Sequence, residues 1–118
     1  MTAIQDKKPY DLEKRTLSFA LAVRDFTKIL PKTPSNFEYI KQLIRSSSSI
    51  GANYIEANES LGKKDFGMRI RISRKEAKET IYWLHLVECD NNTAQREWLL
   101  DECTQLMKIF GAILEKCH

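Results

Sequence analysis

Residues 99–117 read LLDECTQLMKIFGAILEKC, and their apolar side chains recur with the period of an α-helix. Steps of four and three residues place the following on one stripe of such a helix: Leu99, Cys103, Leu106, Phe110, Ile113 and Cys117. The same spacing recurs near the start of the chain, at Leu12, Thr16, Phe19, Val23, Phe26 and Leu30. No two-residue alternation, which would be typical of a strand, competes with it. Both regions are therefore predicted to form amphipathic helices.

Three short breaks divide the chain into four segments of similar length. Pro31 and Pro34 cannot continue a helix. Gly62 offers a second break, and residues 90–92, Asp-Asn-Asn, form a turn-favouring cluster. We expect helices at about 11–30, 36–60, 63–89 and 93–117. Short connections between four such helices predict an all-α fold, an antiparallel up-down-up-down four-helix bundle, with residues 1–118 as a single domain.

The expected helix ends carry capping side chains. Asp11 can cap the first segment. Ser35 and Glu38 have the spacing of a capping box for the second segment, and Asn92 with Gln95 is a weaker version for the fourth.

The middle of the second segment reads SSSSIGA, residues 46–52, and is a poor helix former by intrinsic propensity. It could be a linker or a phosphorylation target, or it could let another helix approach closely. Apolar residues continue with helical period on both sides of it, which favours close packing. The broad face predicted for this segment contains Phe37, Ile40, Leu43, Ile44, Ser47, Ile50, Tyr54, Ile55 and Ala57.

Composition is ordinary for a folded domain of 118 residues, with 42% hydrophobic and 30% charged residues and a net charge of +3. No apolar run approaches the ~20 residues that a membrane span needs, and we expect neither a secretory signal nor a membrane partner. The three cysteines, Cys89, Cys103 and Cys117, have no metal-site or disulfide spacing. We expect the thiols to be reduced and buried, and the protein to be cytoplasmic.

The third segment separates its charged residues from its apolar ones. With 100° of rotation per residue around this helix, one arc is expected to face the bundle. It contains Phe66, Ile70, Ser73, Ala77, Thr80, Leu84 and Val87. A second arc of about 120° holds six cations, here called the basic stripe: Lys63, Lys64, Arg71, Arg74, Lys75 and Lys78. Tyr82 and His85 extend this stripe, and no acidic residue falls inside it.

The basic stripe has two interpretations. Cations on one helical face, with an aromatic side chain that could stack on a base, form a natural track for the phosphates of RNA or DNA. Alternatively, they form the ordinary solvated outer face of a bundle helix. Residues 62–79 have a local charge of +4, whereas residues 88–118 carry six acids and three bases and could offer an opposing acidic surface.

A third face of the same segment, here called the mixed face, combines acids with a tryptophan and aliphatic side chains. Its candidate oligomer-interface residues are Ile72, Glu76, Glu79, Trp83 and Leu86. Aromatic anchors are enriched in contacts between subunits, which favours a homo-oligomer. The alternative is that Trp83 widens the core while Glu76 and Glu79 are solvated.

Motifs for chemistry are sparse. A carboxylate-bridged metal site in a bundle needs Glu-x-x-His pairs, and His85 is preceded at three residues by Tyr82. Asn53, Glu56 and Glu59 could join Glu76 and Glu79 in an acid/base cluster. Structural hydrogen bonds for Asn53 and Glu56, and ion pairs of the glutamates with Arg45 or Arg69, are the favoured interpretation. We expect no enzyme activity, no catalytic residue, no metal and no cofactor.

The segment SSIGANYIEA, residues 48–57, with Asp65-Phe66, Lys75-Glu76-Ala77 and Tyr82-Trp83-Leu84, resembles a family of four-helix-bundle proteins. Members are encoded in intervening sequences of bacterial 23S rRNA genes and carry a ribosomal-protein-like label. The likeness covers roughly residues 10–117. Where many members have Asn-Ile-Ala-Glu-Gly, this chain reads Asn53-Tyr54-Ile55-Glu56-Ala57, which is closer to an Asn-Tyr-x-Glu-Ala variant.

The resemblance implies an antiparallel bundle that assembles into a homopentameric ring. The accessory variability factor of diversity-generating retroelements is similar in fold and binds nucleic acid and a protein through a basic surface. We therefore expect an oligomeric, non-enzymatic protein that binds RNA or acts as an adaptor through the basic stripe and Tyr82. The alternative is a structural or protein-interaction module with no nucleic-acid role.

Overall fold

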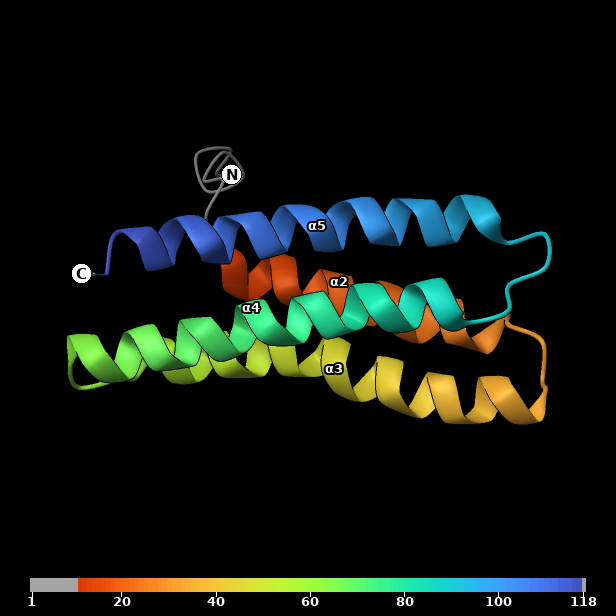
Figure 1. The fold of residues 1–118 in the computed structure, drawn as a ribbon, viewed down its shortest axis with the longest axis horizontal. Coiled ribbons are helices and arrows are strands. Elements are labelled where there is room, and N and C mark those ends of the chain that lie inside the picture. Colours follow the sequence, from red (N-terminus) through yellow and green to blue (C-terminus); the bar gives the residue numbers. More distant parts are fainter. Residues whose placement is uncertain (1–10, 118) are drawn as a thin grey trace.

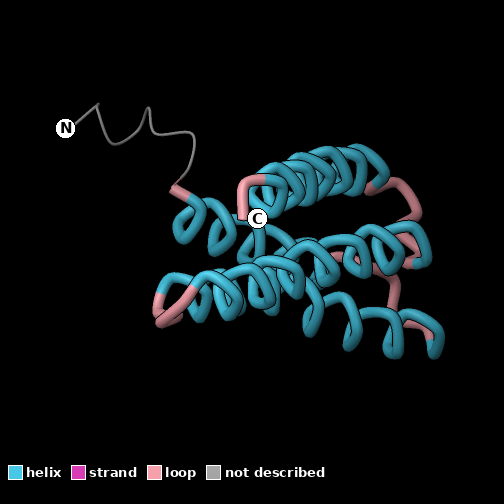
Figure 2. The backbone as a smooth tube through the Cα atoms, turned by 60° about the vertical axis from the view of Figure 1, so that its left-hand side comes forward, coloured by secondary structure: helices cyan, strands magenta, loops and turns pink. Residues whose placement is uncertain are grey.

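The protein is an all-helical bundle in a computed structural model that describes residues 11–117. Four helices follow one another, α2 (Leu12–Lys28), α3 (Pro34–Asn58), α4 (Lys63–Leu86) and α5 (Thr93–Glu115). Consecutive helices run in opposite directions and are joined by short loops at the two ends of the bundle (Figure 1). Figure 2 shows the same arrangement from a second direction. The predicted all-α, four-helix fold is confirmed.

Each of the four helices packs against two others, and α4 lies between α3 and α5. It packs against α3 on one side and α5 on the other, whereas α2 packs against α3 and α5 and makes no close contact with α4. Helix α2 therefore lies diagonally opposite α4. This arrangement leaves the outer surface of α4 facing away from α2.

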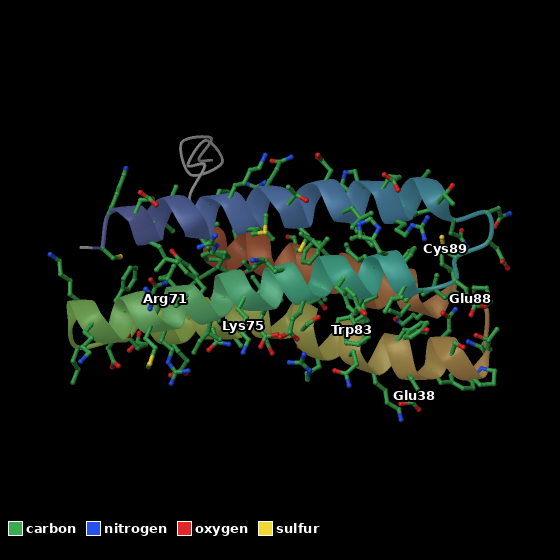
Figure 3. All side chains as sticks on the ribbon, viewed as in Figure 1. Glu38, Arg71, Lys75, Trp83, Glu88 and Cys89 are labelled. Atoms are coloured by element: carbon green, nitrogen blue, oxygen red, sulfur yellow. The ribbon has the colours of Figure 1, made fainter. Side chains whose placement is uncertain are left out.

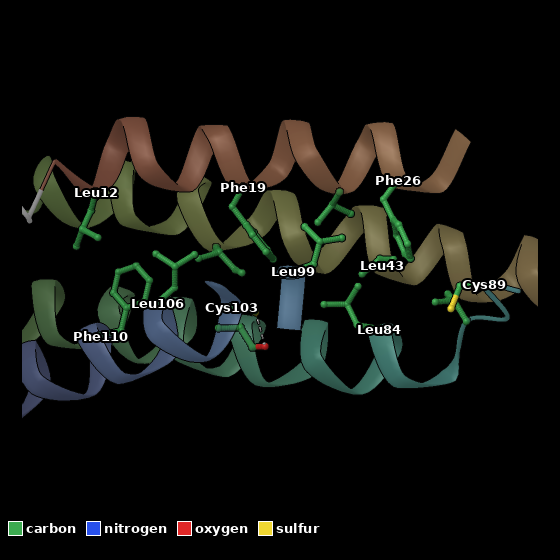
Figure 4. Close-up of a cluster of buried hydrophobic side chains, with 14 of the residues drawn as sticks. Leu12, Phe19, Phe26, Leu43, Leu84, Cys89, Leu99, Cys103, Leu106 and Phe110 are labelled. Carbon is green, nitrogen blue, oxygen red and sulfur yellow. Dashed lines mark hydrogen bonds between the residues drawn. The ribbon is translucent and has the colours of Figure 1, made fainter. Parts of the chain in front are cut away.

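The core is formed by the stripes that the sequence predicts. All six predicted residues of the first stripe are buried, from Leu12 to Leu30. In α5, Leu99, Cys103, Leu106 and Phe110 are buried, whereas Ile113 near the end of the helix and Cys117 just beyond it are half-buried. Figure 4 shows Phe19, Leu106 and Phe110 among the side chains that fill the space between the helices.

The serine-rich part of α3 is continuous helix, so it is not a linker. Gly51 lies so close to α2 that a Cβ atom there would be 2.6 Å from Thr16 Oγ1. Ser46 accepts a hydrogen bond of 2.9 Å from Thr80 of α4. Ser73 of α4 donates one of 2.9 Å to the carbonyl oxygen of Ile50. The small residues therefore allow α2 and α4 to approach α3, as predicted.

Helix α3 differs from the sequence expectation in two respects. It begins at Pro34, and Thr33 Oγ1 accepts the N-terminal hydrogen bond from Asn36 N at 3.1 Å, so the predicted capping box of Ser35 and Glu38 is wrong. Proline suits the first helical position because it lacks the N–H that would be unpaired there. The predicted apolar face is also too broad, because Phe37, Ile44 and Ile55 are exposed.

The other helix ends show one confirmed cap and one wrong one. Asp11 Oδ1 accepts a hydrogen bond from Lys14 N at the start of α2, as predicted. Asn92 precedes α5 but makes no side-chain capping bond. Its amide donates instead to the carbonyl oxygen of Ile29, at 3.4 Å.

Two further side chains stabilise the packing of α5. Arg15 of α2 makes a two-pronged ion pair with Glu102, with Nε–Oε2 at 2.8 Å and Nη2–Oε1 at 3.0 Å.

Cys103 is buried and donates to the carbonyl oxygen of Ala77 at 3.2 Å. Burial, assisted by the nearby Glu102 carboxylate, raises the pKa of the Cys103 thiol to about 12. The three cysteines are free; Cys89 and Cys103 are buried as predicted, whereas Cys117 is only half-buried.

Candidate nucleic-acid interface

The basic stripe lies on one continuous helix, because α4 runs unbroken from Lys63 to Leu86. All six of its cations and Tyr82 are exposed. The arc predicted to face the bundle is buried apart from Phe66, which is half-buried. Figure 3 shows Arg71 and Lys75 on successive turns of α4, followed by Trp83. The helical period therefore separates the cations from the core as predicted.

Within residues 11–117, no cation of the basic stripe lies within 4.0 Å of a carboxylate oxygen; the ion pairs found there all involve other residues. An exposed cation without a carboxylate neighbour keeps its charge available to an incoming anion. This matters because Glu76 and Glu79 are on the same helix and could have neutralised the stripe.

Arg45 of α3 pairs with both of these glutamates. Its Nη1 is 3.2 Å from Glu76 Oε1, and its Nη2 is 2.7 Å from Glu79 Oε1. The hydrogen bond to Glu79 raises the pKa of Arg45, although partial burial opposes the shift. The two carboxylates beside the stripe are thus compensated by a cation from another helix, and the positive charge of the stripe is left unopposed.

A surface hollow of about 480 Å³ lies along this part of α4. It is lined by Arg71, Arg74, Lys75, Lys78, Glu79, Tyr82 and Trp83. Four of the six predicted cations therefore gather around one depression, together with the predicted aromatic residue. Lys63 and Lys64 do not line it; they line a smaller hollow near Cys117 at the end of the bundle, and Arg71 lines both hollows.

The aromatic residues at the end of the hollow form a row. The ring of Tyr82 meets that of Trp83 edge to face, with centroids 5.2 Å apart and an interplanar angle of 75°. Trp83 in turn lies 6.3 Å from Tyr39 of α3, centroid to centroid. The Tyr82 ring is therefore supported from one side by aromatic packing that reaches into the neighbouring helix.

The mixed face has contacts within the chain that the sequence did not specify. Glu76 and Glu79 pair with Arg45, and Trp83 packs on Tyr39, whereas Ile72 and Leu86 are half-buried on the same helix. The combination of acids with tryptophan is thus explained by packing between α3 and α4. A subunit contact at these residues stays a prediction.

The residues considered for an acid/base cluster do not gather. Asn53 Oδ1 accepts a hydrogen bond of 3.1 Å from Arg69, and its amide donates to Ser49 O, so Asn53 links α3 to α4. Glu56 and Glu59 are exposed, and no structural contact of the Glu56 carboxylate is found in the described part.

Residues 11–117 contain no group of three His, Cys, Asp or Glu side chains placed to hold a metal ion. Over that range, no helix has the length and apolar character needed to span a membrane.

Sequence reasoning missed one hollow and underrated one residue. A hollow of about 460 Å³ between α2 and α5 is lined by Ala22, Asp25, Phe26, Ile29, Gln95, Trp98 and Leu99. Trp98 is 58% exposed there, and its position just outside the apolar stripe of α5 was the only available signal. Arg45 was one of two candidate ion-pair partners, and the choice between them depends on how α3 packs on α4.

Comparisons with known proteins agree with this fold. A family model described as 23S rRNA-intervening sequence protein matches residues 8–112. A crystal structure from Bacteroides thetaiotaomicron, described as a protein of unknown function from the S23 ribosomal protein family, is similar at 31% identity and a TM-score of 0.74. The match covers 86% of this chain and 96% of that chain. No curated protein matches the sequence.

Proposed function

Because the chain belongs to the 23S rRNA-intervening sequence protein family, we propose that it is a non-enzymatic protein that binds RNA through the basic stripe of α4. The observation that carries the proposal is the set of six exposed cations on one helical face, with no carboxylate partner among residues 11–117. The family description names a gene location, and the S23 relative is described as having unknown function, so the proposal depends on the charges of α4. We expect a cytoplasmic location for this role.

The physical basis is the release of counterions from the phosphate backbone. Each phosphate that a lysine or arginine neutralises contributes about 0.7 to the slope of log affinity against log salt for a single strand. Contacts from three to six cations of the stripe correspond to a slope between about −2 and −4.

The first test is fluorescence anisotropy with a labelled RNA hairpin that has an unpaired loop. We expect the affinity to fall roughly 20- to 300-fold between 50 mM and 200 mM salt, as this slope requires. Absence of binding at low salt, or binding that does not change with salt, would contradict the proposal. In the control titration, an uncharged crowding agent replaces the protein at the same mass concentration, which measures nonspecific solution effects on the anisotropy.

A protein-interaction role is the second candidate, supported by exposed apolar side chains. Leu17 and Leu21 are exposed one turn apart on α2, and Ile44 and Ile55 are exposed on α3. Apolar surface of this kind commonly marks contacts with another protein or another copy. We propose self-association through it, with the pentamer implied by the family resemblance as the expected state.

Light scattering measures this directly. We expect a defined oligomer for the unmodified protein and a smaller species when Leu17 and Leu21 are both replaced by lysine. Leu61→Lys is the matched control, because Leu61 is fully exposed in the loop between α3 and α4. A monomer from the unmodified protein would reject self-association without affecting the RNA proposal.

A further inference from the structure

Tyr82 is an exposed aromatic side chain at the end of a row of cations. The residue is 60% exposed. Its edge-to-face contact with Trp83, and the contact of Trp83 with Tyr39, support it from within the bundle. The ring is therefore held in place while much of its surface remains available to a ligand.

The position of Tyr82 relative to the cations suits a nucleic-acid strand whose phosphates contact the cations and one of whose bases contacts the ring. Lys75, Lys78 and Tyr82 lie on successive turns, and the rise of 1.5 Å per residue places Tyr82 about 6 Å along the axis beyond Lys78. Lysine and arginine in the same hollow would contact phosphates, whereas the tyrosine has nothing to offer a phosphate except one hydroxyl group. Its ring is suited to the face of a base.

We propose that Tyr82 stacks on an unpaired base, so that the ligand of the α4 hollow is a single-stranded segment of nucleic acid. This inference rests on the proposed RNA-binding function and makes it more specific. Bases inside a duplex already stack on their neighbours and offer no free face, whereas bases in loops and single strands can be splayed onto an aromatic ring. A duplex would contact the cations of the hollow and leave Tyr82 unused.

The test compares a single-stranded RNA of 15 nucleotides with a blunt RNA duplex of the same length, both labelled with fluorescein. We expect Tyr82→Ala to weaken binding of the single strand about 10-fold and to change binding of the duplex less than about twofold. Tyr82→Phe keeps the ring and should stay within about twofold of the unmodified protein for both probes. Trp98→Ala is the matched control, because Trp98 is a comparably exposed aromatic residue on α5.

A second readout reports stacking itself. A single strand that carries 2-aminopurine should lose fluorescence on binding, since stacking quenches this base, and Tyr82→Ala should reduce the quenching. Equal losses for single strand and duplex, or an equal effect of Trp98→Ala, would overturn the stacking role. If both probes bind with the expected salt dependence and Tyr82→Ala changes neither affinity nor quenching, stacking fails and the basic-stripe proposal stands. If neither probe binds, both proposals fail.

Discussion

Replacing Arg71, Lys75 and Lys78 together with glutamate should lower the affinity for RNA by about 100-fold or more at low salt. Three phosphate contacts are lost, and three carboxylates are placed where the phosphates would lie. The slope of log affinity against log salt should become shallower by about 2, since each contact contributes about 0.7. All three side chains are exposed, so the thermal unfolding midpoint should change little. Anisotropy titrations and circular-dichroism melts measure the two effects.

The matched control reverses three exposed lysines that lie outside α4. Lys14 and Lys28 belong to α2 and Lys32 to the loop after it, and α2 makes no close contact with α4. Replacing these three with glutamate changes the net charge by the same amount. We expect an affinity within a fewfold of that of the unmodified protein. Equal losses in the two triple variants would mean that net charge, and not the stripe on α4, determines binding.

Asn36→Ala should lower the free energy of unfolding by about 3 kcal/mol. Asn36 is fully buried, and its amide donates to Pro31 O at 2.9 Å and to Glu88 O at 2.8 Å. Its Oδ1 accepts from Glu88 N at 2.9 Å. These bonds join the loop before α3 to the segment after α4, and alanine would leave three backbone groups without their partner. Urea denaturation followed by circular dichroism measures the loss.

Ser35→Ala is the control for this substitution. Ser35 is the neighbouring residue, is exposed and does not cap the helix, so its replacement should change the free energy of unfolding by less than about 0.5 kcal/mol. If the two alanine variants were equally stable, the three hydrogen bonds of Asn36 would contribute no net stability.

The role of Asn36 could not be predicted from the local sequence motif. The motif Ser-Asn-Phe-Glu at residues 35–38 matches a capping box, and this match placed Asn36 in the first turn with no role of its own. The helix begins two residues earlier than Ser35 suggested, because Thr33 and Pro34 supply an equally suitable start. That shift leaves the amide of Asn36 free to bond a segment 52 residues away, which no local pattern encodes.

Helix α3 illustrates the limit of periodicity in a bundle. Phe37, Ile44 and Ile55 belong to the predicted apolar face but are exposed, while Leu43, Ile50 and Ala57 are buried. The period assigns an angle to each residue around the helix, but it does not say how wide a sector the neighbouring helices cover. Helices α2 and α4 cover only part of this sector. Of the residues left uncovered, Ile44 and Ile55 belong with Leu17 and Leu21 of α2 to the surface we propose for self-association.

The amino-acid sequence alone determined that the chain forms four helices and that the cations of α4 lie apart from its apolar side. Both follow from the angle of 100° per residue, which acts within a single helix and needs no knowledge of its neighbours. Tertiary structure alone decided that Arg45 compensates Glu76 and Glu79, that Trp83 rests on Tyr39, and that Asn36 joins two loops. These contacts join residues 31 to 52 positions apart and depend on how helices are placed side by side, which helical period does not specify.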